Sequence, residues 1–201
     1  MPGYTKQLPF ERGSTANTGQ TVDATTLDNL EGKEYMVEDY SPSTGVVRTG
    51  HMVRLRCVRN KAAAALLPKR LVTFSTTAGK YGNQVTGYAD TTAENAYPVD
   101  EYLPAAGVAV DDLFYIVVEG PAVVLSDLAG AATNLIPVGT VLVALTAVTS
   151  GATTAGRVAP QDLTGATAVL ALQVQNRLGY ALTARTTTNT DADILVNVAR
   201  W

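Results

Sequence analysis

The sequence has 201 residues, 46% of them hydrophobic and only 16% charged, with a formal net charge of −3. This length suits one domain with an extension, and the negative charge argues against a nucleic-acid binder, because nucleic acids attract basic proteins. The single Cys57 excludes an intrachain disulfide, and no apolar run reaches the roughly 20 residues that a membrane span requires. We therefore expect a protein of a cytoplasm-like compartment, or one delivered from it by lysis, with neither a nucleic-acid nor a membrane partner.

The N-terminal residues 1–30 are polar and show no hydrophobic period. Such a segment cannot bury enough apolar surface to offset its ordering entropy by itself. One interpretation is a tail without fixed structure. The other, which we favour, is an arm that orders on a neighbouring molecule through spaced apolar anchors, namely Tyr4, Leu8, Phe10 and Leu27. Residues 1–32 are thus predicted to be an extended arm, and residues 33–201 the folded domain.

The first predicted strands are residues 34–40 and 51–59, separated by the turn sequence SPSTG at residues 41–45. The second strand alternates strictly, with Val53, Leu55 and Cys57 on one face and Arg54 and Arg56 on the other. A one-sided antiparallel strand has this pattern. After it, Asn60 is placed to cap a short helical turn that Pro68 would end.

The central prediction is a β-hairpin. Short strands at residues 71–74 and 85–88 lead to an apolar run at residues 113–118, rich in β-branched and aromatic side chains. Asp111 and Asp112 form a polar turn before this run. The sequence EGP at residues 119–121 interrupts the run, and an apolar segment resumes at residues 122–125, which predicts strand, tight turn and strand.

Further strands are predicted in the C-terminal part, at residues 140–148, 157–159, 168–175, 179–182 and 194–198. Short strands at intervals of roughly 8–15 residues, joined by turns rich in Gly, Pro and Thr, are typical of barrels and sandwiches. The predicted fold class is therefore all-β: a single β-barrel or sandwich-like domain with an extended N-terminal arm.

Candidate catalytic residues are few. His51 is the one histidine, and it begins an arginine-rich strand without a serine in a nucleophile-elbow setting. One His and one Cys are too few for a typical zinc site. Two carboxylate doublets, Asp100–Glu101 and Asp111–Asp112, are interpreted as turn and solvated-edge residues, because neighbours on a strand face opposite ways. We expect no catalytic residue, no metal site and no cofactor.

The basic residues are unevenly distributed. Residues 46–70 carry seven of the 15 basic residues and no acid, which leaves 8 basic residues against 18 acidic ones elsewhere. Three interpretations are open: a solvated strand face, a surface for an acidic protein partner, or a nucleic-acid site, which the scarcity of interleaved aromatic residues disfavours. Arg54 and Arg56 are the residues expected to meet acidic groups of a partner.

Several short motifs of the chain occur in an order known from one class of protein. They are VDDLFY (110–115), VEGP (118–121), VGTVL (138–142), TAGRV (154–158), GYA (179–181) and the final segment 194–201. Over roughly residues 46–201, the chain resembles the capsid decoration, or cement, proteins of tailed bacteriophages. The resemblance does not include the polar arm or the arginine-rich strand.

The resemblance implies a non-enzymatic β-barrel protein of the virion, on the capsid exterior, assembled in the host cytoplasm. Such a protein binds the outer surface of an icosahedral head, bridges capsomers and stabilises the shell. The implied partners are the major capsid protein and sister copies in a homotrimer. An alternative is a tail or receptor-binding β module, which shares the Thr, Gly and Val-rich character. A small hydrolase would need convergent polar residues that the sequence does not offer.

Overall fold

The computed structural model describes residues 8–16, 30–89, 96–126, 135–144, 156–161, 177–186 and 192–199. Within these ranges the chain consists of strands, turns and bends, which confirms the all-β prediction, and none of them contains a helix that could cross a membrane. The strands are β1 Glu34–Tyr40, β2 Val47–Asn60, β3 Leu71–Phe74, β4 Gln84–Tyr88, β5 Tyr97–Pro98, β6 Leu113–Ser126, β7 Val141–Ala144, β8 Val158–Pro160, β9 Arg177–Ala181 and β10 Ala192–Val198.

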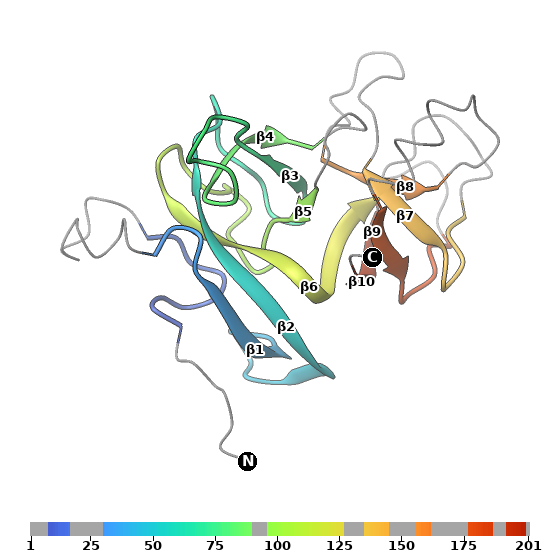
Figure 1. Cartoon of the computed structure of the whole chain (residues 1–201). Helices are drawn as coiled ribbons and strands as arrows, with labels where there is room; N and C mark the ends of the chain where they lie inside the picture. The colour runs from blue at the N-terminus through green and yellow to red at the C-terminus, as the bar shows by residue number, and fades with distance from the viewer. Residues whose placement is uncertain are drawn as a thin grey trace, which may run out of the picture.

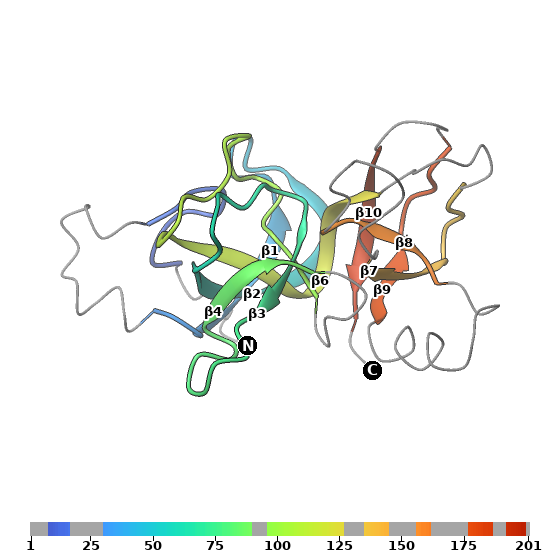
Figure 2. The same ribbon diagram turned by 90° about the horizontal axis from the view of Figure 1, so that it is seen from above.

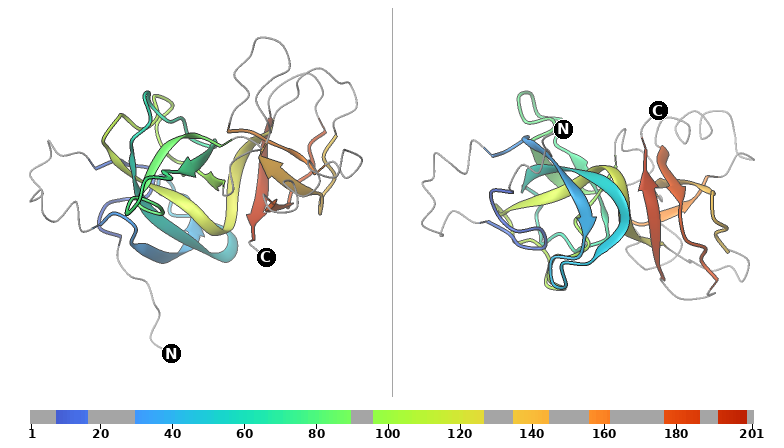
Figure 3. Two further views of the ribbon diagram at one scale, coloured as in Figure 1. Left: turned by 45° about the horizontal axis from the view of Figure 1, so that its top comes forward. Right: turned by 90° about the horizontal axis from the view of Figure 1, so that it is seen from below.

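The long strand β6 belongs to two groups of strands (Figure 1). Its first half pairs with β2, and the sheet continues through β4 and β3 to β5; Val99, directly after β5, then bridges back to Ile116 of β6. Its second half pairs with β10, and the order β6–β8–β7–β9–β10 closes into a five-stranded barrel. We call these the first and second barrels; they lie side by side with β6 running between them (Figures 2 and 3).

The predicted hairpin at residues 113–125 is wrong, because β6 is one continuous strand. Its two halves pair with different strands: Arg54 of β2 lies opposite Glu119, and Val198 of β10 lies opposite Gly120. The register against β2 shifts at this point, which is a β-bulge. Gly120 has φ +97°, and a Cβ there would lie 2.5 Å from the carbonyl oxygen of Met52. Glycine therefore permits a bend that redirects the strand, where a turn was expected.

The predicted helical turn after Asn60 is also wrong. Strand β2 continues to Asn60, and residues 61–67 form bends and one bridge, Leu66 to Val108. The buried Asn60 side chain donates to the carbonyl of Val108 at 2.9 Å and accepts a hydrogen bond from the Ala62 N–H at 2.9 Å. The amide thus satisfies backbone groups of an irregular segment.

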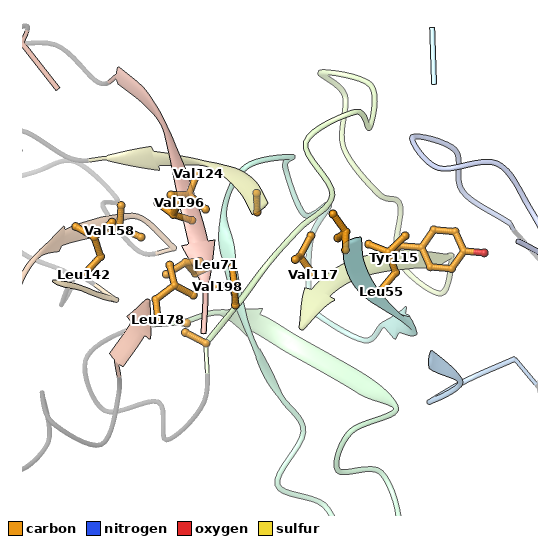
Figure 4. Close-up of a cluster of buried hydrophobic side chains, with 14 of the residues drawn as sticks. Leu55, Leu71, Tyr115, Val117, Val124, Leu142, Val158, Leu178, Val196 and Val198 are labelled. Atoms are coloured by element: carbon orange, nitrogen blue, oxygen red, sulfur yellow. The ribbon is translucent and has the colours of Figure 1, made fainter. Parts of the chain in front are cut away.

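The first half of β6 is buried on both faces. Phe114, Ile116 and Val118 point into the first barrel, where they pack with residues of β2 to β5. Leu113, Tyr115 and Val117 face the other way, beneath β1 and residues 8–16, and this second cluster extends into the second barrel (Figure 4). Val53, Leu55 and Cys57 of β2 are buried, as the alternation predicted, and the strand is buried on both faces from Cys57 to Asn60.

Candidate functional site

The two arginines predicted to bind a partner are paired with acids of their own chain. Arg54 contacts Glu119 at 2.8 Å and Glu34 at 3.6 Å. The Nε of Arg56 donates to Glu34 at 2.9 Å, and its guanidinium lies 5.5 Å from the centre of the Phe74 ring. Both side chains thus line the exposed side of β2 in intrachain contacts. Their interaction with acids of a partner stays a prediction.

The uneven charge along the sequence is compensated in the fold. At least six of the seven basic residues between positions 46 and 70 form ion pairs with acids from other elements. Besides the pairs above, these are Arg48 with Asp39 and Glu101, Arg59 with Glu31, Lys61 with Asp111, and Lys69 with Asp193. The seventh, Arg70, lies over the ring of Tyr88 at 5.8 Å. The positive charges of the basic segment are therefore largely neutralised by acidic residues of the same chain.

Residues 8–16, which we call the strap, pack on the first barrel. The ring of Phe10 stacks on Tyr115 with 4.4 Å between centroids, and Leu8 is partly buried against the same core. Ala16 and Leu113 exchange backbone hydrogen bonds of 3.0 and 2.8 Å. The structure therefore gives Leu8 and Phe10 an intrachain role, and a role toward a partner stays a prediction. Of the other two predicted anchors, Tyr4 and Leu27 lie outside the described residues.

A buried charge cluster joins the strap to the barrel. Arg12 of the strap is buried; its Nε donates to Asp100 at 3.0 Å, and its Nη1 lies 3.6 Å from Asp39. Arg48 donates to both oxygens of Asp39, at 2.8 and 2.9 Å, and also to Glu101. We name this set, Arg12, Asp39, Arg48, Asp100 and Glu101, the buried charge cluster.

The cluster connects five segments: the strap, β1, β2, residues 100–101 and β6. The second oxygen of Asp100 accepts the backbone N–H of Gly13 at 2.9 Å, and Glu101 accepts the backbone N–H of Val123 on β6. Burial raises the pKa of Asp100, against the opposing effect of Arg12. Burial likewise raises the pKa of Glu101, against that of Arg48. The cluster holds three carboxylates and two guanidinium groups, so its interactions are structural ion pairs in a desolvated setting.

The sequence interpretation of the two carboxylate doublets is half right. Asp111 is exposed, has φ +71° and pairs with Lys61, whose hydrogen bond lowers the pKa of Asp111, so it is a turn residue as predicted. Asp100 and Glu101 are not solvated-edge residues, because both side chains are almost fully buried.

The burial of one cluster member, Asp39, could have been predicted from the sequence. In β1, Tyr35 and Val37 are buried, and the two-residue period of a strand places Asp39 on the same inner face. Asp39 is fully buried there. Arg12 had no comparable signal, since it stands in a segment with no period. Its burial depends on carboxylates that the chain supplies 27 and 88 residues later.

The residues with catalytic potential do not converge. His51 is exposed, whereas Cys57 is buried, and its pKa is raised to about 12, mainly by burial. The two residues are six positions apart on β2, a separation of roughly 20 Å along an extended strand. Among the described residues, no group of three or more His, Cys, Asp or Glu side chains is arranged to hold a metal ion.

No protein-family model and no curated protein matches the sequence. Among solved structures, the chain is similar to the head fiber gp8.5 N base of bacteriophage phi29. The two share 15% sequence identity with a TM-score of 0.40, and the match covers 74% of this chain and 95% of that chain. A likeness of this extent carries no argument about function.

Proposed function

We propose that this chain is a non-enzymatic structural protein of a tailed-phage virion. It binds the outer surface of the head, bridges capsomers and thereby stabilises the shell. The proposed partners are the major capsid protein and sister copies in a homotrimer, without nucleic acid, membrane or cofactor. The motifs between residues 110 and 201 support this class of protein.

The observation that carries the proposal is the distribution of exposed apolar side chains over a body built on one strand. Val46 is 62% exposed beside the β1–β2 turn of the first barrel, and Val138 is 63% exposed in the turn before β7 of the second. Because β6 is shared by the two barrels, the strands next to both turns belong to one continuous sheet. A protein that bridges neighbouring capsomers needs two contact regions held at a fixed separation, and we propose that these exposed valines, one on each barrel, belong to those regions.

Co-sedimentation with undecorated phage heads tests this function. We expect the wild-type protein to sediment with the heads, and Val46→Asp and Val138→Asp each to lower the bound fraction several-fold. Val110→Asp is the matched control, because Val110 is 46% exposed in the turn before β6. Wild-type protein that stays in the supernatant would contradict the proposal, and electron microscopy of virions that places the protein on the tail would favour the alternative module.

Three further measurements examine the partners. Arg54→Ala should weaken head binding mainly at low salt, because salt screens exposed charges. Residues 1–7 can be deleted to test Tyr4 without removing the strap; undiminished binding would show that Tyr4 is not an anchor. The homotrimer predicts a sedimentation mass of three chains at micromolar concentration or on the head.

The non-enzymatic character has its own test. His51→Ala should leave head binding unchanged and the fold intact, because His51 is an exposed strand residue. Loss of function in that variant, with an unchanged circular dichroism spectrum, would revive an enzymatic or metal-dependent role.

A further inference from the structure

One surface of the first barrel is free of charged side chains. It is formed by residues 62–67, between β2 and β3, and residues 104–109, between β5 and β6, which contain only Ala, Leu, Pro, Gly and Val. Val110 lies beyond this surface, in a turn with the charged Asp111. We call the exposed residues of the two segments the apolar plate; they are Ala63, Ala64, Ala65, Leu67, Pro104, Ala105, Ala106 and Ala109.

The two segments of the plate lie against each other. Leu66 and Val108 exchange backbone hydrogen bonds of 3.1 and 2.8 Å. The side-chain amide of Asn60 donates to the carbonyl of Ala64 at 3.3 Å and to that of Ala109 at 3.1 Å, so both segments meet at one nitrogen atom. The plate is therefore one continuous surface. A continuous exposed apolar surface is typical of a contact with another protein.

Backbone polar groups of the plate find partners within the chain. Besides the bonds of Asn60, the N–H of Gly107 donates to the carbonyl of Pro104 at 2.8 Å, and the N–H of Leu67 donates to the hydroxyl of Tyr88 at 2.9 Å. A backbone group that loses water without another partner costs free energy. Because these groups are already bonded, the plate can be covered by a dry, apolar surface.

The absence of charge favours a second copy of this chain as the partner. Where identical surfaces meet around a symmetry axis, a residue near the axis faces its own copy, and a charged residue there would face its own sign. The plate avoids this repulsion. The exposed face of β1 and β2 does not, since Met36 lies opposite Arg54 and Met52 opposite the exposed Glu38. Alanine side chains also lose no rotamer entropy when they are covered.

We propose that the apolar plates of sister copies pack against one another around a symmetry axis and hold the oligomer together. The proposal rests on the homotrimer of the proposed function and names its contact surface. It does not depend on whether the oligomer binds a phage head, so the protein alone is sufficient for the test.

Sedimentation equilibrium of the full chain, without phage heads, tests this contact. We expect the wild-type protein to form an oligomer in the micromolar range. Ala64→Asp and Ala105→Asp should each raise the dissociation constant about tenfold or more, because like carboxylates would be buried together. Val138→Asp is the control, a substitution of an exposed apolar residue of the second barrel, and should leave the dissociation constant unchanged. The circular dichroism of each variant should match that of the wild type, because the substituted residues are exposed.

A mixing experiment shows whether the plate packs against the same surface of a sister copy. Ala105→Lys alone should dissociate as Ala105→Asp does, because like charges again meet. An equimolar mixture of the two variants should recover most of the association, since opposite charges then face each other.

Three outcomes overturn the proposal. Wild-type protein that stays monomeric throughout the micromolar range excludes the contact, and weaker co-sedimentation of Ala64→Asp with heads would then assign the plate to the capsid protein. An oligomer that neither Asp substitution alters would place the contact elsewhere. A mixture that does not recover association would show that the plate packs on a different surface of the sister copy. Wild-type oligomers that do not bind heads, but dissociate in both Asp variants, would contradict only the proposed head binding.

Discussion

The Nε of Arg12 donates a hydrogen bond to Oδ1 of Asp100 at 3.0 Å, across 88 positions of sequence, and both side chains are buried. The pair fixes the strap on the first barrel. A buried ion pair adds little stability relative to apolar residues, but removal of one partner leaves an uncompensated charge in a desolvated site. The strap is therefore part of the folded body, and its removal should lower the free energy of unfolding of the first barrel.

We expect Arg12→Ala to lower the free energy of unfolding by about 3–5 kcal/mol, because Asp100 keeps its burial and loses its cation. Urea unfolding followed by circular dichroism measures the change. Lys61→Ala is the control, since Lys61 pairs with the exposed Asp111, and it should change the free energy of unfolding far less than Arg12→Ala does, because exposed ion pairs contribute little. Equal effects of the two substitutions would show that the Arg12 pair is not buried in solution.

Phe10→Ala should loosen the strap while the barrel stays folded. Phe10 is partly buried, and its ring stacks on Tyr115, so we expect a loss of roughly 1–2 kcal/mol. Hydrogen exchange at the backbone amides of Ala16 and Leu113, which bond each other's carbonyls, should accelerate in the variant. Exchange at Val85 in the first barrel, measured in the same experiment, should not change. Unchanged protection at Ala16 would contradict the role of the stack.

Gly179→Ala should prevent folding of the second barrel. Gly179 has φ +151°, and a Cβ there would lie 1.9 Å from the carbonyl oxygen of Asn197 on the neighbouring strand. Strands β9 and β10 would have to separate, so we expect insoluble or partly unfolded protein. Gly87→Ala in β4 is the matched control, because a Cβ at Gly87 meets nothing within 4 Å. Soluble yield and melting temperature distinguish the two variants.

The thiol of Cys57 should make stability fall at alkaline pH. Its pKa is raised from 9.0 to about 12, with burial as the main cause. Because the folded pKa is above the unfolded one, this contribution is fully present below pH 9 and is lost as the pH rises from about 9 to about 12. By pH 10.5 the loss amounts to about 2 kcal/mol.

Unfolding in urea at pH 8.5 and at pH 10.5 checks this expectation. Wild-type protein should lose more free energy of unfolding between the two values than Cys57→Ala does. The native thiol should also resist modification by a disulfide reagent at pH 8.5. Equal losses in the two proteins would show that Cys57 ionises in the fold as easily as in the unfolded chain.

Local pattern was enough to predict the β class and most strand positions among the described residues; the strand predicted at residues 168–175 lies outside them. The alternation of Val53, Leu55 and Cys57 placed these residues in the core, because a strand buries every second side chain on one face. Strands β1 and β3 occur with the predicted bounds, and β4 and β10 lie within two residues of them. The basic segment, one of the two candidate contact regions beside the arm anchors, was visible as composition, but its acidic partners were not, since they lie on other elements.

Tertiary structure alone decided the partners of each segment. The sequence EGP at residues 119–121 permits either a hairpin turn or a bend, and β6 continues because β2 and β10 offer separate partners to its two halves. The same holds for Arg12, which is buried because Asp39 and Asp100 converge on it. Residue types and their period determine which faces are apolar and where strands form. Which strands meet, and which charges are neutralised, depends on contacts between residues tens of positions apart, which no local pattern encodes.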